Sequence, residues 1–216
     1  MKKIISRIKL LFKSRFLARR LQAKFVIAAQ SDQGLETVVD LGAGEAPYQK
    51  FFKAEKYICI DVENRKGTAD VIIADVNQGI PIGDNQADVV LCIEVLEHLR
   101  EPAFVIQEIH RILKPGGRLV LSTPMVWQVH EPPNDFFRYT EFGLKHLLEK
   151  AGFKKYEIKP SNNYFYTLCQ LINMKLRNKF FLPLVFLLNV LALLSFNQRQ
   201  NSLPIDNHLI AYKDEN

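Results

Sequence analysis

From Leu35 onward, apolar residues form short β-branched runs that alternate with segments of helical spacing. Runs typical of strands occupy 37–41, 57–61, 70–76, 87–95 and 117–124. Their nearly continuous apolar character favours parallel strands that are covered on both faces. Two more strand candidates follow at 155–159 and 208–213. The order of elements predicts an α/β fold with a doubly wound, mainly parallel, seven-stranded sheet and helices on both faces.

Helical patterns fill the connections between these strands. The segment 103–113 has an apolar stripe, and the "KPGG" at 114–117 is expected to end that helix. A second helix is predicted over 140–153, with Thr140 as its N-cap and Gly152 at its end. A shorter helical segment is expected in "PYQKFF".

Residues 1–31 form a basic arm with the pattern of an amphipathic helix. The arm contains nine Lys or Arg residues and no Asp or Glu, so the rest of the chain has 20 basic and 23 acidic residues. Its apolar residues recur at helical spacing: Ile4, Ile5, Ile8, Leu11, Phe12, Phe16, Leu17 and Leu21. This pattern fits a helix on an anionic membrane surface, a helix packed on the domain with its cations in water, or a mitochondrial transit peptide. A nucleic-acid surface is not indicated, because the basic character is confined to the arm.

The remaining residues, 32–216, are predicted to form one domain with an apolar helical insert at about 164–200, before the last strand. Residues 180–196 have no charge, and 17 helical residues span about 26 Å, less than the roughly 30 Å of bilayer hydrocarbon. Pro183 and Asn189 weaken a membrane-spanning interpretation further. Two alternatives stay open, a helical hairpin that dips into one leaflet and a helix buried in a homodimer interface.

The cysteines predict neither a disulfide framework nor a metal site. Cys59, Cys92 and Cys169 lie far apart and form no CxxC pair or His/Cys cluster. We therefore expect no bound metal and a reducing, cytoplasmic compartment.

The glycine turn after the first predicted strand raises the question of its ligand. In "VVDLGAGEAPYQKFF", Gly42 and Gly44 allow a sharp turn and close approach of a ligand. A dinucleotide site needs GxGxxG, but the third glycine position is Pro47. Asp40 precedes the turn, and a carboxylate there repels a pyrophosphate and favours a cationic ligand.

This stretch resembles motif I of the class I S-adenosylmethionine-dependent methyltransferases, whose fold is Rossmann-like. The resemblance covers about residues 36–153 and extends through "IPIGDNQADVVLCIEVLEHLREP" and "RILKPGGRLVLSTP". It implies S-adenosylmethionine as the cofactor, Asp61 on the ribose hydroxyls and Asp75 at the adenine amino group. With Asp40 and the two glycines, Val76 and Glu94 complete the implied cofactor site.

The loop after the fifth strand is the candidate acceptor site. Methyl transfer from a sulfonium mainly requires alignment and exclusion of water, with a base only where the acceptor loses a proton. The segment "HEPPNDFFRYT" resembles one found in methyltransferases of glycan and cell-envelope pathways. We expect His130 and Glu131 to be catalytic and Asp135, Arg138 and Tyr139 to bind the substrate. The competing interpretation is that these side chains brace the loop, and His98 fits a cap, a packing residue or an acid–base group equally.

The sequence therefore predicts a methyltransferase that acts on a small-molecule, glycan or lipid-linked acceptor at the cytoplasmic membrane surface. We expect either a peripheral membrane contact or a homodimer through the insert. Two rivals are a membrane-associated scaffold that keeps the fold without turnover, and an NAD-binding or nucleotide-sugar-binding enzyme.

Overall fold

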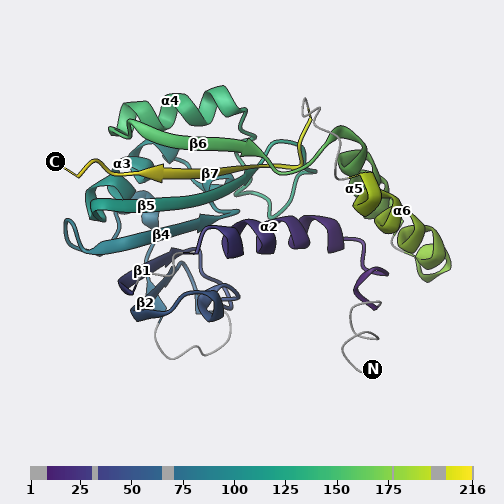
Figure 1. Ribbon diagram of the computed structural model, residues 1–216, viewed down its shortest axis with the longest axis horizontal. Helices are drawn as coiled ribbons and strands as arrows, with labels where there is room; N and C mark the ends of the chain where they lie inside the picture. Colours follow the sequence, from purple (N-terminus) through teal and green to yellow (C-terminus); the bar gives the residue numbers. More distant parts are fainter. Residues whose placement is uncertain (1–8, 31–33, 65–70, 177, 196–202, 216) are drawn as a thin grey trace.

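The computed structural model describes residues 9–30, 34–64, 71–176, 178–195 and 203–215. Its centre is a seven-stranded sheet with the order β3-β2-β1-β4-β5-β7-β6 (Figure 1). The strands are β1 (Leu35–Leu41), β2 (Ala54–Asp61), β3 (Val71–Ile73), β4 (Ala87–Ile93), β5 (Leu113–Pro124), β6 (Lys155–Pro160) and β7 (Asp206–Tyr212). The first five pair in parallel, whereas β7 pairs antiparallel with both β5 and β6. The predicted doubly wound, mainly parallel sheet is confirmed.

The two faces of the sheet bury alternate side chains. On one face, Val90 and Cys92 of β4 pack toward α3 (Pro102–Ile112) and α4 (Glu141–Ala151). On the other face, Val89 and Leu91 pack toward the end of α2 (Phe16–Ala28). Figure 1 shows α3 and α4 on one side of the sheet and α2 on the other. Because both faces are covered, the strands have the apolar runs from which they were predicted.

Several boundaries differ from the sequence prediction for local reasons. Strand β4 ends at Ile93 because Glu94 adopts a left-handed backbone with φ of 56°. Strand β3 ends at Ile73, since Asp75 instead caps the short helix η2 (Val76–Gln78) by accepting from the Asn77 backbone N–H. The segment "PYQKFF" contains only one short helix, η1 (Gln49–Phe51). The α4 caps are confirmed, with the Thr140 side chain accepting from Gly143 N and Gly152 at φ of 100°.

The arm and the insert pack together. The insert contains α5 (Tyr164–Lys175), η4 (Lys179–Phe181) and α6 (Leu182–Leu194), which project from the sheet beside α2 (Figure 1). Leu17 and Leu21 of α2 are buried against Tyr166, Cys169 and Ala192 of α5 and α6, which together are called the hairpin below. Residues 1–8 and 196–200, parts of the predicted arm and insert, lie outside the described residues. Within the part of the chain that is described, no helix combines the length and the apolar character needed to cross a bilayer.

Buried side chains of the hairpin also hydrogen-bond to the backbone of the arm. Gln170 donates to the Ser14 carbonyl (2.9 Å), Asn189 to the Leu11 carbonyl (2.6 Å) and Tyr166 to the Leu17 carbonyl (3.2 Å). Asn173 donates in turn to the Asn189 side chain at 2.9 Å. The described arm residues from Lys9, together with α2, α5, η4 and α6, are therefore called the arm–hairpin unit below.

Candidate functional site

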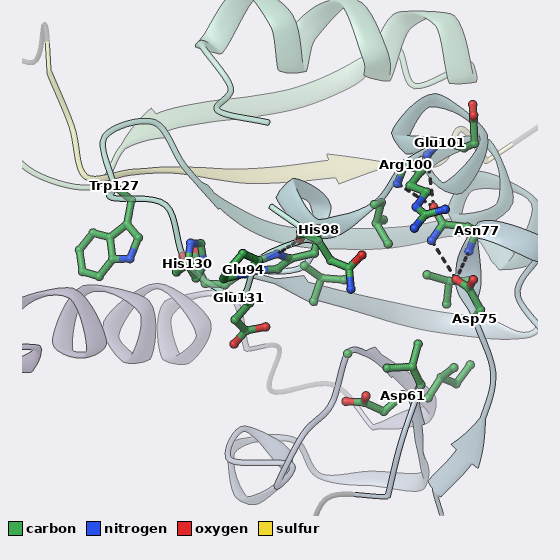
Figure 2. Close-up of a pocket in the computed structure, with 18 of the residues that line it drawn as sticks. Asp61, Asp75, Asn77, Glu94, His98, Arg100, Glu101, Trp127, His130 and Glu131 are labelled. Carbon is green, nitrogen blue, oxygen red and sulfur yellow. Dashed lines mark hydrogen bonds between the residues drawn. The ribbon is translucent and has the colours of Figure 1, made fainter. Parts of the chain in front are cut away.

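The main cavity lies at the carboxyl ends of the parallel strands. The chain leaves β1 toward β2 on one side and crosses to β4 on the other, so the strand order reverses between β1 and β4. Ligands of doubly wound sheets bind at such a point. A cavity of about 910 Å³ opens there. Its lining includes five of the predicted site residues at the strand ends, Gly42, Asp61, Asp75, Val76 and Glu94 (Figure 2).

The glycine turn shapes one wall of the cavity. Gly42 has φ of 61°, and a Cβ at this position would lie 2.5 Å from Val95 Cγ2, so only glycine fits. The Gly42 N–H bonds to the Ile60 carbonyl at 2.8 Å, which ties the turn to β2. Gly44 also has positive φ, and its N–H donates to Asp61 Oδ2 at 2.9 Å. The turn therefore holds the Asp61 carboxylate at the cavity wall.

Asp40 lies behind this turn rather than in the cavity lining. Its side chain is 2% exposed and accepts a 2.6 Å hydrogen bond from Tyr57 OH. Burial raises its pKa to about 7, although the Tyr57 hydrogen bond opposes the shift. Asp40 and Gly44 thus support the turn and Asp61, and neither belongs to the cavity lining, so their contact with the cofactor stays a prediction.

The Asp75 end of the cavity is built from a short polar network. Asp75 accepts from the backbone N–H and the side chain of Asn77 at 3.0 and 2.8 Å. Asn77 Oδ1 in turn accepts from the backbone N–H groups of Arg100 and Glu101. Asn77 and Arg100 both line the cavity, and the sequence analysis did not select either of them. The sequence around Asn77 and Arg100 gave little indication of a site, because the hydrogen bond between them joins two separate loops.

Glu94 lies in the middle of the cavity. Its backbone is left-handed, and Ser122 Oγ of the neighbouring strand β5 donates to Glu94 Oε1 at 2.6 Å. Burial raises the pKa of Glu94 to about 7, and the Ser122 hydrogen bond opposes that shift. Gln22 of α2 lines the cavity together with Glu94, so the arm forms this side of the cavity.

Two histidines and a buried glutamate meet at the acceptor side. Glu97 is fully buried, and its Oε1 has no hydrogen-bond partner among the described residues. This oxygen lies 3.7 Å from His98 Nε2 and 4.0 Å from His130 Nε2. His98 Nδ1 lies 2.5 Å from the Asn134 carbonyl, which can only accept, so this nitrogen bears a proton.

The charges of this cluster follow from burial. Burial raises the pKa of Glu97 well above its usual range, and the nearby Glu94 charge adds to the shift. Burial lowers the pKa of His130, so its imidazole is neutral near pH 7 and able to accept a proton. One ligand atom each from Glu97, His98 and His130 lies within 4.8 Å of the others, so the cluster has the chemistry to hold a proton or a divalent cation.

The other residues predicted in the loop brace it. Arg138 forms a bidentate pair with Asp135 at 2.6 and 2.8 Å and donates to the Gln128 and Phe137 carbonyls. The Asp135 pKa is well below its usual range, mainly because of the Arg138 hydrogen bonds. The Asp135 carboxylate also accepts from the His130 backbone N–H at 2.8 Å. These contacts hold His130 in the wall of the cavity.

Tyr139 is buried and donates from its hydroxyl to the Leu96 carbonyl at 3.3 Å. Neither Asp135, Arg138 nor Tyr139 belongs to the cavity lining, so the bracing interpretation fits all three better than substrate contact. Glu131 does line the cavity, on an exposed turn with φ of 51°, and no hydrogen bond between described residues joins it to His130. The sequence analysis missed Trp127 and the α2 residues of the lining, which are Arg15, Ala18, Arg19 and Gln22.

Comparisons with known proteins agree with this geometry. A family model described as a methyltransferase domain matches residues 12–158. A ubiquinone biosynthesis O-methyltransferase of Pseudomonas syringae pv. tomato is 38% identical over 130 residues, which cover 58% of this chain and 50% of the relative. The chain thus spans about half or less of the curated relatives that it matches.

Solved structures share the fold at low sequence identity. One matching chain belongs to a Haloferax volcanii complex that contains the Trm112 methyltransferase activator. Its TM-score is 0.63 at 18% identity, and the match covers 93% of this chain and 93% of that chain. The Haemonchus contortus phosphoethanolamine N-methyltransferase 2, solved with S-adenosyl-L-methionine, matches with a TM-score of 0.59 at 13% identity over 85% of this chain and 50% of that chain. The family match spans most of the sheet and the whole glycine turn, so the chain belongs to the methyltransferase-domain family and has the class I methyltransferase fold that its sequence predicted.

Proposed function

We propose that this protein transfers a methyl group from S-adenosylmethionine to a hydroxyl of a small-molecule or lipid-linked acceptor. The observation that supports this most directly is the arrangement of one cavity. The glycine turn, Asp61 and Asp75 form one end, and Glu97, His98 and His130 form the other. A methyl donor at the first end therefore faces acid–base groups at the second.

The cofactor end fits S-adenosylmethionine in charge and shape. Asp61 offers carboxylate oxygens for the ribose hydroxyls, and the Asp75–Asn77 network offers acceptors near the adenine. Glu94 places a third carboxylate beside the glycine turn, which favours the cationic sulfonium and amino groups. The same carboxylates repel a pyrophosphate, which argues against the NAD or nucleotide-sugar alternative.

The acceptor end fits removal of a proton. In the proposed mechanism His130 accepts the hydroxyl proton through Nε2. S-adenosylmethionine would supply the methyl group, whose bond to sulfur breaks as its bond to the acceptor oxygen forms, with S-adenosylhomocysteine as the leaving group. Asp135 and Arg138 hold His130 in position, and the Asp135 carboxylate, 3.3 Å from His130 Nδ1, stabilises the imidazolium that forms. Glu131, at the cavity mouth, contacts the bound acceptor in this proposal.

The arm–hairpin unit supports a peripheral position at the cytoplasmic face of the membrane. Large apolar side chains are exposed over its surface: Leu10, Phe12, Ile172, Phe180, Leu184, Leu187, Leu191 and Leu194. Residues 1–31 and 161–205 contain 13 of the 29 basic residues and none of the 23 acidic ones. An apolar surface on segments whose only charged residues are cations is complementary to an anionic bilayer. A second copy of the chain would bring the same cations into the contact, which disfavours the homodimer alternative.

The test has two parts that separate the rival functions. Calorimetry with S-adenosylhomocysteine and, separately, with NAD identifies the cofactor. Incubation with radiolabelled S-adenosylmethionine and solvent-extracted membranes then follows label into a lipid product. Binding of S-adenosylhomocysteine without any label transfer would favour the scaffold, and binding of NAD alone would refute the methyltransferase proposal.

A further inference from the structure

Two arginines of the cavity lining have no ion-pair or side-chain hydrogen-bond partner among the described residues. Arg15, the N-cap of α2, and Arg19, within α2, both line the cavity and are exposed to solvent. Neither side chain forms an ion pair or hydrogen bond with another described residue. They lie one helical turn apart, with the Arg19 N–H bonded to the Arg15 carbonyl at 3.3 Å, so they share one face of the helix.

The positions of these arginines along the helix give them an order in the cavity wall. Gln22, Arg19 and Arg15 all line the cavity and follow one another toward the N-terminal end of α2. The Arg19 charge opposes the rise in the pKa of Tyr48, which lies four residues after Gly44 of the glycine turn. Arg15 lies about 6 Å farther along the helix, by four residues of 1.5 Å each. Next to it, the Ser14 carbonyl is held by Gln170 of the hairpin.

Charge matching then assigns different anions to the two arginines. S-adenosylmethionine has one carboxylate, and Arg19, the nearer of the two arginines to the glycine turn, would hold it. Arg15 lines the same cavity and has no anionic partner among the described residues. An exposed guanidinium tolerates this, but its fork of donors is suited to phosphate or carboxylate oxygens.

An apolar path begins beside Arg15. Phe12 is 38% exposed and stacks on Phe186 of α6 with ring centroids 4.9 Å apart. Trp127 lies in the cavity lining and packs against the buried cluster of α2 and the hairpin. A chain that leaves the cavity past Arg15 therefore reaches the exposed apolar surface of the arm–hairpin unit.

We propose that Arg15 binds a phosphate group that joins the methylated part of the acceptor to a hydrocarbon chain. This inference rests on the proposed function and narrows it to a phosphate-linked lipid. The phosphate lies at the cavity mouth, the hydrocarbon chain follows Phe12 toward the bilayer, and the head group reaches Glu94 and His130. A neutral quinol-type lipid would leave Arg15 without a partner.

Trp127 provides a direct measurement, because it is the only tryptophan in the chain and lines the cavity. The fluorescence of Trp127 is followed in full-length protein saturated with S-adenosylhomocysteine. Farnesyl phosphate and farnesol are titrated in separate experiments, each below the critical micelle concentration of that probe. The two probes share a chain and differ in the phosphate. We expect farnesyl phosphate to bind at least about tenfold more tightly, as for a charge-assisted bidentate contact.

Arg15→Gln is expected to remove most of this preference and to leave affinity for S-adenosylhomocysteine unchanged. Arg20→Gln is the matched control, because Arg20 is exposed on α2, lies outside the cavity lining and acts on Tyr166 instead. The control should keep the preference of the natural protein. Equal affinity for the two probes, or an unchanged preference in Arg15→Gln, would overturn the proposal.

Two further outcomes distinguish other sources of the same chemistry. If short-chain dihexanoyl phosphatidylglycerol binds as tightly as farnesyl phosphate and with the same Arg15 dependence, Arg15 binds bilayer head groups and the acceptor assignment is wrong. If Arg15→Gln loses S-adenosylhomocysteine instead, Arg15 holds the cofactor and the assignment is also wrong. Failure of the natural protein to bind S-adenosylhomocysteine would refute the proposed function itself.

Discussion

Asp61 offers the sharpest test of the cofactor site. Its side chain is 6% exposed, and it accepts from Gly44 N at 2.9 Å and Glu63 N at 3.4 Å. Each carboxylate oxygen has two lone pairs, so both oxygens can still accept from ribose hydroxyls. Asp61→Asn keeps the shape and one acceptor oxygen but removes the charge. The bonds that lose their charge are worth about 1.5–3 kcal/mol, so we expect the dissociation constant to rise roughly ten- to a hundredfold.

Calorimetry with S-adenosylhomocysteine measures this change without depending on the acceptor. Asp88→Asn is the matched control, because Asp88 also accepts two backbone N–H groups, from Glu36 and Thr37, but lies outside the cavity lining. The control is expected to change the free energy of unfolding and to leave cofactor affinity alone. A folded Asp61→Asn variant with unchanged affinity would show that Asp61 supports the turn and does not bind ribose.

Two further predictions concern titrating groups. His130→Ala should lower turnover without changing affinity for S-adenosylhomocysteine. Because burial lowers the His130 pKa, the rise of activity with pH in the natural protein should lie below pH 6.5. A fully active variant would exclude His130 as the base. The pKa of Asp40 is raised to about 7 in the fold, so this carboxyl binds more protons in the folded state than in the unfolded chain between about pH 4 and 7. The contribution of Asp40 to the free energy of unfolding should therefore fall by as much as about 4 kcal/mol as pH rises through that window. Urea unfolding of the unliganded protein at about pH 4 and 8 measures this loss, and an Asp40→Asn variant that keeps the same slope would assign it to other groups.

The parts of the site that sequence predicted are those set by local chemistry. Gly42 needs a left-handed backbone and space for Val95, and both requirements are visible as a glycine at a strand end. Asp61 and Asp75 follow strands, so the parallel topology alone brings them to one edge of the sheet. The α4 caps are local for the same reason.

The parts that sequence did not predict depend on contacts between distant segments. Arg15 reaches the cavity because Gln170 holds the carbonyl of Ser14, which lies 156 residues earlier in the chain, and no pattern in either segment contains that pairing. Asp135 and Arg138 illustrate a different difficulty. A pair of opposite charges three residues apart in an aromatic loop fits substrate contact and internal bracing equally, and only the bidentate geometry distinguishes the two.

The structure also changes how membrane binding should be tested. The hydrogen bonds from Gln170 and Asn189 join the arm and the insert, so the two cannot be removed independently of each other. Deleting residues 1–31 would also remove α2 and therefore a wall of the cavity. Substitutions of exposed side chains are the better perturbation, because they leave the buried contacts of the arm–hairpin unit intact.

Leu187, Leu191 and Leu194 are 50%, 39% and 76% exposed on α6, so replacing all three with serine should cost the fold little. Full burial of one leucine contributes about 1.5–3 kcal/mol, so even half insertion of three should amount to at least about 2 kcal/mol, or more than tenfold in partitioning. Lys9→Gln with Lys13→Gln should weaken binding by about 1 kcal/mol for each cation at low salt and have little effect at high salt. Sedimentation with phosphatidylglycerol vesicles measures both, with Phe142→Ser as the control, since Phe142 is 73% exposed on α4, outside the unit. If the natural protein stays in the supernatant at low salt while ultracentrifugation finds a dimer that the leucine substitutions dissociate, the exposed face of the unit is a homodimer interface and the membrane proposal is wrong.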